Sequence, residues 1–502
     1  MVAATAEADR PAGFRDAFAS GEFRALYAAS SLSWLGDYLA RAAITAMVLS
    51  ATGSVTASAA AFAISFAPWL LGGNVLVAVA ERYPYRRVMV WCDLARMIIM
   101  AVVAALGETA PLLPLLGLLL LSALFTPPFE AARSATLPAV LGPHRYVVGV
   151  AINAATTPPI QITGYFLGAA LATWDAQLAL GFNAVTFGVS ALLVRFAVAP
   201  REAALRQEHR RGLLRETADG FRVVFTNPAL RALVLLVFCG SLFAVVPEGL
   251  GAAWADYRAG EIDRAWSQGL VMGAVPAGLV LGSLSSRLIR PSARRQVLRP
   301  LAVATPLVLV PAVFNPPVPV VAAMALLSGL AIGALVPVAN GEFVQALPAA
   351  FRARAFGVVS AGLQLLQGGA VLATGALAAR APLPLVVGLW SLGGVLLMIG
   401  MAVNWPAPRA FAEAGALAAA HDPPAPSPKH QEPGPSPQPH EPVRSPQPSP
   451  APESRRVPQP RRPDGEDQRA TPSTPTPQLP RPASEGPGRA GDGPWRAAIP
   501  EQ

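Results

Sequence analysis

The sequence predicts an all-α membrane protein with about twelve transmembrane helices and a disordered, proline-rich C-terminal tail. Its 502 residues are 53% hydrophobic and only 14% charged, which is more apolar surface than a soluble protein of this length can bury in one core. Apolar stretches long enough to cross a bilayer recur up to residue 404. From residue 406 onward they give way to proline-rich runs without a periodic apolar face.

Twelve stretches meet the length requirement of roughly 20 apolar residues for a helix that crosses the hydrocarbon. Pro111 and Pro114 interrupt the boundary between the third and fourth, and Asn315 with the two prolines after it closes the ninth early. The predicted spans are residues 25–50, 57–80, 88–107, 111–133, 147–173, 176–198, 230–255, 266–289, 300–315, 318–345, 355–380 and 383–404.

The basic residues predict the orientation of these helices. Residues 406–502 carry 11 basic and 11 acidic residues, so the net charge of +9 lies in residues 1–405, which carry 28 basic against 19 acidic residues. With both termini in the cytoplasm, 23 of the 28 fall in or beside inner loops, as the positive-inside rule favours. Because this rule accounts for the arginines, nucleic acid is not an expected partner. The single lysine, Lys429, is typical of a GC-rich bacterial genome, so we expect a bacterial inner membrane.

An internal repeat predicts two parallel, pseudo-symmetric halves. Three short matches lie in equivalent loops and are separated by nearly the same number of residues, which indicates two six-helix bundles. The matches are Arg24-Ala25-Leu26 with Arg231-Ala232-Leu233 (offset 207), Leu137-Pro138-Ala139 with Leu347-Pro348-Ala349 (offset 210), and Arg82 with Arg287 (offset 205).

These boundaries predict five segments. They are a cytoplasmic N-terminus (1–24), an N-terminal six-helix half (25–198, the N-half), a cytoplasmic linker (199–229), a C-terminal six-helix half (230–405, the C-half) and the tail (406–502). Arginines alternate with leucines in the linker, so we expect it to be partly helical and to lie along the membrane surface. The composition of the tail predicts an extended chain, with the docking of a protein partner as an open alternative.

A charged loop between the second and third spans carries a family resemblance. The loop reads Ala78-Val79-Ala80-Glu81-Arg82-Tyr83-Pro84-Tyr85-Arg86-Arg87, and Asp93 and Arg96 follow in the third span. Together with Trp34-Leu35-Gly36-Asp37 and Arg352-Ala353-Arg354-Ala355-Phe356-Gly357, it resembles the major facilitator superfamily, and most of all its bacterial macrolide and enterobactin efflux branch. The resemblance covers residues 14 to about 400 and implies the major facilitator fold. Ala78 and Glu81 stand where the family usually has glycine and aspartate.

We expect the charged residues near the inner loops to form a cytoplasmic gate. Acids near helix N-termini and arginines near C-termini gain about 0.3–1 kcal/mol each from the helix dipole, and contacts made only when the halves close would favour the closed state. The alternative is that the arginines only set topology. Glu130 is within reach of Arg133, and Glu342 of Arg352 or Arg354. The predicted gate residues are Glu81, Arg82, Arg86, Arg87, Asp93, Arg96, Glu130, Arg133, Glu342, Arg352 and Arg354.

Two acids deeper in the spans are the candidates for coupling and substrate binding. An ionised side chain at this depth costs at least about 2.5 kcal/mol, so it normally faces the bundle interior or a wet cavity. Asp37 has Arg41 one helical turn further on, close enough for a pair that is either functional or purely structural. Glu248 follows Pro247 at a helix break and has no basic residue nearby in sequence, as a proton carrier requires. The predicted site is therefore Asp37, Arg41 and Glu248.

The remaining patterns exclude other classes of protein. There is no phosphate-binding loop for ATP, and Cys92 and Cys239 lie inside spans, where they form neither a disulfide framework nor a metal site. We therefore expect no enzyme activity, no cofactor and no metal. The expected function is the export of a small amphipathic compound by alternating access, coupled to protons. We expect the chain to carry this out while embedded in the lipid bilayer. An uptake permease of the same fold and a non-transporting sensor or scaffold that uses the tail are the alternatives.

Overall fold

The computed structural model describes residues 13–68, 82–107, 111–201, 221–260 and 262–421, and within these ranges the chain is helical without a β-strand. The chain divides into Met1–Asp422 and Pro423–Gln502, and every described helix belongs to the first unit. The end of the predicted second span, Glu81, most of the linker and the tail after residue 421 lie outside the described residues.

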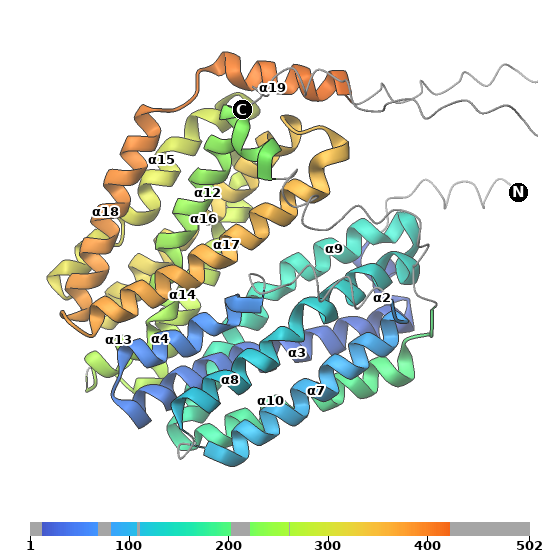
Figure 1. Cartoon of the computed structure of the whole chain (residues 1–502), viewed down its shortest axis with the longest axis vertical. Coiled ribbons are helices and arrows are strands. Elements are labelled where there is room, and N and C mark those ends of the chain that lie inside the picture. Colours follow the sequence, from blue (N-terminus) through green and yellow to red (C-terminus); the bar gives the residue numbers. More distant parts are fainter. Residues whose placement is uncertain (1–12, 69–81, 108–110, 202–220, 261, 422–502) are drawn as a thin grey trace, which may run out of the picture. The chain divides into compact units, whose positions relative to one another are not determined.

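The N-half begins with a long helix whose two ends follow from the sequence. Ser20 accepts a hydrogen bond from the Phe23 amide at the start of α3, and Gly53 ends the helix in the left-handed conformation, φ 61°. Gly142, φ 68°, separates the two helices that run through α9, because only glycine adopts this backbone without strain. The helices are α2 (Phe14–Phe18), α3 (Gly21–Thr52), α4 (Val55–Ala63) with η1 (Ile64–Phe66), α7 (Tyr85–Leu106), α8 (Leu112–Leu124), α9 (Thr126–Trp174) and α10 (Ala176–Ala197) (Figure 1).

The C-half repeats this succession of helices. The Asn227 side chain accepts hydrogen bonds from the Ala229 and Leu230 amides at the start of α12 (2.9 and 3.3 Å). The predicted break after Pro247 is present, since α12 ends at Gly249 and α13 begins at Gly251. The helices are α12 (Pro228–Gly249), α13 (Gly251–Tyr257), α14 (Arg264–Ser285), η3 (Ser286–Leu288), η4 (Pro291–Ala293), α15 (Arg294–Leu307), η5 (Val310–Phe314), α16 (Val318–Gln345), α17 (Ala349–Ala378), α18 (Leu383–Val403) and α19 (Pro408–His421).

The described helices overlap all twelve predicted spans. Nine are long and apolar enough by themselves, and one of these runs from Leu112 to Gly142 through α8 and the first part of α9. The other three are α3, whose Asp37 and Arg41 lower its hydropathy, the shorter apolar helix Val55–Phe66, and α9 after Gly142. This arrangement confirms the predicted all-α membrane fold.

The structure corrects the predicted start of the disordered tail. Residues 408–421 form α19, with Phe411 and Ala414 buried. The Phe411 ring stacks on Trp405 with centroids 5.9 Å apart, and the Arg295 guanidinium lies 5.3 Å from its centroid. An apolar stripe at helical spacing, completed by Ala418, explains this helix. The proline content of the later residues concealed it.

The two halves meet at one end of their helices, which we call the outer end. There the Thr56 hydroxyl donates to the Gly375 carbonyl (3.0 Å), and the Gln268 amide donates to the Ala42 carbonyl (2.7 Å). These bonds join α4 to α17, which lie side by side, and α14 to α3 (Figure 1). The opposite end, which we call the arginine-rich end, carries the start of α7 with Arg86 and Arg87 and the start of α15.

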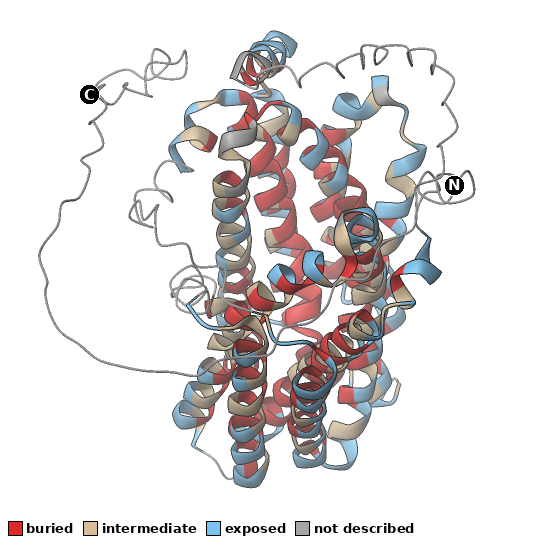
Figure 2. Ribbon diagram, turned by 90° about the vertical axis from the view of Figure 1, so that its right-hand side faces the viewer, coloured by how far each residue is buried: buried red, intermediate tan, exposed pale blue. Residues whose placement is uncertain are grey.

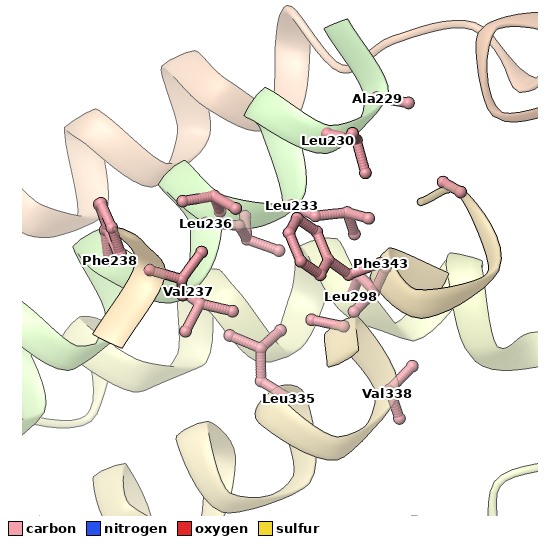
Figure 3. Close-up of a cluster of buried hydrophobic side chains, with 14 of the residues drawn as sticks. Ala229, Leu230, Leu233, Leu236, Val237, Phe238, Leu298, Leu335, Val338 and Phe343 are labelled. Carbon is pink, nitrogen blue, oxygen red and sulfur yellow. The ribbon is translucent and has the colours of Figure 1, made fainter. Parts of the chain in front are cut away.

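Burial follows the faces that the helices turn toward one another. Buried residues line the facing sides, and exposed residues cover the outer sides (Figure 2). The largest cluster fills the C-half between α12, α15 and α16, with Leu233, Leu298, Leu335 and Phe343 at most 4% exposed (Figure 3). These apolar contacts fix the helices that carry the polar side chains of the site.

Candidate functional site

A cavity of about 360 Å³ lies between the two halves. A second cavity of about 540 Å³ shares Asp37, Tyr38 and Arg41 with the first and extends along Trp34 and Glu130 toward the arginine-rich end. Both volumes fall in the usual range for small-molecule sites, roughly 300–1,000 Å³. Polar side chains from both halves line the first cavity: Asp37, Arg41, Gln161, Glu248, Gln364 and Gln367.

Glu248 of the C-half is hydrogen-bonded to α9 of the N-half. The Tyr165 hydroxyl donates to its Oε1 at 2.5 Å, and Gln161 Nε2 donates to the same oxygen at 3.1 Å. Glu248 is 8% exposed, and Tyr165 is fully buried. The carboxylate predicted from the helix break therefore lies in the cavity and joins the two halves.

The predicted pairing of Asp37 with Arg41 is wrong. Asp37 instead accepts two hydrogen bonds from Arg96 Nη2, to Oδ1 at 2.6 Å and to Oδ2 at 2.5 Å. Arg96 comes from α7, and its side chain is 3% exposed. Asp37 thus pairs with an arginine of another helix and not with the arginine four residues further on. The reason is that a buried guanidinium of α7 points toward α3 at the depth of Asp37.

Asp93 and Arg96, predicted as gate residues, lie inside the N-half. Asp93 begins the third turn of α7, about 12 Å along the axis from Tyr85. It is fully buried, accepts a 2.6 Å hydrogen bond from the Ser190 hydroxyl and lies 3.9 Å from Arg96. Arg96 also covers the Phe187 ring at 3.9 Å from the centroid. The two residues therefore form a buried network with Asp37 rather than part of the loop.

Arg41 takes a different position from the other deep charges. Its guanidinium lies over the rings of Tyr38, Phe62 and Phe66, at 5.3, 5.4 and 5.8 Å from their centroids. Its Nη1 is 3.5 Å from the Tyr165 hydroxyl oxygen. It lines both cavities and is half-buried.

The described residues of the predicted loop part of the gate make no hydrogen bond or ion pair with the C-half, and their one side-chain hydrogen bond stays within the N-half. Arg82 and Arg87 are exposed, and Glu81 lies outside the described residues. Arg86 donates to the Val198 carbonyl at 3.2 Å and so satisfies a carbonyl at the C-terminus of α10. The gate stays a prediction, because the halves meet at the outer end in this structure.

A second ionic contact ties the start of α3 to the chain after α10. Arg201 pairs with Glu22 through both carboxylate oxygens. This hydrogen bond lowers the pKa of Glu22, against an opposing effect of burial. The pair orders the arginine-rich end of the N-half, since it holds residues 179 positions apart.

The remaining acids of the predicted gate pair as follows. Glu130 accepts from Arg133 at 2.7 Å, as the sequence suggests, and from the Trp34 indole at 2.8 Å. Glu342 pairs with Arg295 at 2.5 Å instead of Arg352 or Arg354. The start of α15 approaches α16 there, which the loop sequence did not reveal.

The charged partners of Glu342 that were expected have other contacts. Arg352 donates to the Leu347 carbonyl at 3.3 Å, and Arg354 lies 6.0 Å from the Phe351 ring centroid. Both of these contacts are local to the start of α17.

Two polar residues of the site escaped the sequence reasoning. Tyr165 and Ser190 donate hydrogen bonds to two buried acids, Glu248 and Asp93 respectively. A buried tyrosine hydroxyl usually has a hydrogen-bond partner, so a tyrosine inside a span was the one available signal. Ser190 offered no such signal, because serines in membrane spans often serve only to let helices pack closely.

No group of three or more potential metal ligands occurs among the described residues, and both cysteines there are free thiols. Nothing in this donor set would hold a resident metal ion, because the acids are taken up by arginine, tyrosine, serine and glutamine.

Comparisons with known proteins agree with this architecture. Residues 26–250 match the family model described as Major Facilitator Superfamily. A POT family transporter in complex with 5-aminolevulinic acid has a similar structure, with a TM-score of 0.60 and 12% identity over 76% of this chain and 95% of that one. The chain has the major facilitator fold. No curated protein matches the sequence.

Two further solved structures share the major facilitator fold with this chain. A bacterial homologue of the iron transporter ferroportin in the inward-facing state has a TM-score of 0.58 and 14% identity, covering 77% of this chain and 98% of that chain. The nucleoside transporter NupG has a TM-score of 0.53 and 16% identity, covering 76% and 100%. At 12–16% identity, these likenesses concern the fold.

Proposed function

We propose that this protein is a proton-coupled secondary transporter that exports a small amphipathic organic compound. The observation that carries the proposal is Glu248, a buried carboxylate that lines the central cavity of one half and is hydrogen-bonded by the other. In this fold, substrate and coupling-ion sites lie at the interface between the repeats, near the middle of the bilayer. The export direction and the efflux branch are supported by the motifs in residues 14–400.

Protonation of Glu248 would change how tightly the halves hold together. As a carboxylate it accepts charge-assisted hydrogen bonds from Tyr165 and Gln161, which are roughly twice as strong as neutral ones. A proton on Glu248 removes that advantage and weakens a contact between the halves at the outer end. The equilibrium between the two open states then shifts with proton occupancy, as coupled alternating access requires.

The structure described here corresponds to one of the two open states of that cycle. The halves meet at the outer end through Thr56 and Gln268, and the 540 Å³ cavity extends toward the arginine-rich end. With both termini in the cytoplasm of a bacterium, as the arginine distribution favours, this is the inward-open state. Closure at the arginine-rich end would assemble the predicted gate.

The test is gradient-driven transport by the purified full chain in proteoliposomes. Candidate compounds come from a resistance screen of cells with and without the protein. Glu248→Gln keeps the size and hydrogen bonding of the side chain but cannot ionise, so it should abolish gradient-driven accumulation while substrate exchange is retained. Full gradient-driven transport by Glu248→Gln would remove Glu248 from the coupling role.

Uptake is a second candidate direction, favoured by one feature of the cavity. Arg41 and Glu248 line the same cavity, so an anionic compound at Arg41 and a proton at Glu248 would bind together rather than compete. Such positive linkage is expected of a symporter. Vesicles with an imposed proton gradient of either sign distinguish the two directions.

The scaffold alternative has a simple test. A chain ending at residue 422 keeps α19 and removes only the proline-rich segment. Unchanged substrate flux by this chain would exclude a function that depends on a partner bound to the tail.

A further inference from the structure

Arg41 is a cation in the central cavity without a carboxylate partner among the described residues. Ion pairs with N···O distances up to 4.0 Å are absent for this side chain, although the acids of the cavity include Asp37 and Glu248. By contrast, Arg96 and Arg133 of the same half have a carboxylate oxygen at 2.5 and 2.7 Å. The partner expected for Arg41 from the sequence, Asp37, is bound by Arg96.

The contacts that Arg41 does make leave most of its hydrogen-bonding groups available. The rings of Tyr38, Phe62 and Phe66 stabilise the cation through their faces without accepting conventional hydrogen bonds from its N–H groups. A guanidinium has five N–H donors, and only one contact, with the Tyr165 hydroxyl at 3.5 Å, uses them on a protein side chain. The planar donor edge matches the two oxygens of a carboxylate.

The internal repeat places Arg41 opposite a negative charge. Adding the offset of 207 that relates Arg24 to Arg231 takes Arg41 to Glu248. The first helix of each half thus presents a charge of opposite sign at the equivalent position, and both line one cavity. Glu248 accepts hydrogen bonds from Tyr165 and Gln161 through Oε1, and among the described residues no ion pair joins it to Arg41.

We propose that Arg41 binds a carboxylate group of the transported compound, and that Tyr38 and Phe66, which line the same cavity, contact the apolar part beside it. The substrate class is thereby narrowed to amphipathic organic acids. This inference rests on the proposed transport function and deepens it by naming the group that is recognised.

The experiment measures binding to the purified full chain in detergent, without any gradient. The probes are three acids, 3-phenylpropionate, 4-phenylbutyrate and indole-3-acetate, each compared with its uncharged amide through the shift in thermal unfolding midpoint over a concentration series. We expect an acid to stabilise the wild type at concentrations where its amide does not. Arg41→Gln should weaken acid binding at least about tenfold, as the loss of a charge-assisted bidentate pair implies, and leave amide binding unchanged.

Two further variants separate recognition from folding. Arg41→Lys keeps the charge but loses the planar fork, so its affinity for the acid should lie between those of wild type and Arg41→Gln. Arg380→Gln removes an exposed arginine outside the cavity and should bind like wild type. If Arg41→Gln does not fold, the test rests on Arg41→Lys, whose affinity for the acid should be lower than that of Arg380→Gln.

Three results would overturn the inference. They are equal binding of acid and amide to the wild type, undiminished acid binding by Arg41→Gln or Arg41→Lys, and no stabilisation of the wild type by any of the three acids. Gradient-driven transport that persists alongside such results would leave the proposed function intact with an uncharged substrate. Acid binding at Arg41 without any gradient-driven transport would instead contradict the proposed function.

Discussion

The interior of the N-half holds charged side chains at mid-depth, whereas the interior of the C-half is a cluster of aliphatic and aromatic side chains (Figure 3). In the N-half, Arg96 links Asp37 of α3 to Asp93 of α7, and Ser190 of α10 completes the network. In the C-half, Glu248 is placed at the edge that faces the N-half. Two halves of the same topology therefore differ in where their mid-depth charges lie: the N-half pairs them between its own helices, and the C-half presents Glu248 to the N-half.

The largest effect is expected from Arg96. Arg96→Met keeps the length of the side chain but leaves Asp37 and Asp93 without their cation, and breaking a buried pair this way costs about 3–5 kcal/mol. We expect a large fall in the thermal unfolding midpoint, because the charges of Asp37 and Asp93 are then buried without a compensating cation. The double variant Asp37→Asn with Arg96→Met should recover part of the loss. An unchanged midpoint for Arg96→Met would show that the network is not a structural unit.

The matching change in the C-half is Leu335→Ala. Leu335 is fully buried in the apolar cluster, so its truncation should cost about 2–5 kcal/mol through lost contacts and a cavity. Because no ionisable group is involved, the loss in unfolding midpoint should be the same at every pH. Leu365→Ala, at a 46% exposed position on α17, is the control and should change little. A loss that varies with pH would show that an ionisable group contributes to this cluster.

A smaller effect is expected where the halves meet. Tyr165→Phe removes the 2.5 Å hydrogen bond to Glu248 and leaves the bond from Gln161, at a cost of about 1–3 kcal/mol for the charged acceptor. We expect the proton concentration for half-maximal transport to change, with folding preserved. Tyr38→Phe is the matched control, because its ring lines the same cavity and its hydroxyl makes no hydrogen bond with the described residues. Identical pH profiles for both variants would argue that Tyr165 only packs.

The sequence was sufficient for the spans because each requires a long apolar run, which is a local property. It also located Glu248 through the break at Pro247, and Glu130 with Arg133 through their spacing on one helix. It failed for Asp37, since which arginine it binds depends on how α7 is rotated against α3. That rotation is set by packing over the whole bundle, which no short pattern encodes.

The same limit applies at the arginine-rich end. Glu342 pairs with Arg295, which is 47 residues away in the sequence. Helix α19 forms because a stripe of apolar residues lies among the prolines. Composition averaged over residues 406–502 hides that stripe. The local pair of Glu130 with Arg133 was thus predictable, and the pairs between helices were not.

The smallest effect concerns the gate, which would bring the two halves together at their arginine-rich ends. Arg82 is exposed in the state described here, so Arg82→Ala should leave this state unaffected and remove one contact of at most about 1 kcal/mol from the closed state. The resting population should then shift toward opening at the arginine-rich end by up to about fivefold. Labelling of Ser134→Cys, which lines the larger cavity, measures this shift after both native cysteines are replaced by alanine.

Arg195→Ala is the control for the gate, because Arg195 is exposed at the same end and belongs to no predicted gate contact. Both substitutions remove one positive charge from the same side of the membrane. If the arginines only set topology, the cysteine introduced at position 134 should be labelled at the same rate in both variants. Faster labelling in Arg82→Ala alone would show that this arginine favours the closed state. Equal labelling in both would leave the central cavity, with Arg41 and Glu248, as the part of the molecule that controls the exchange between states.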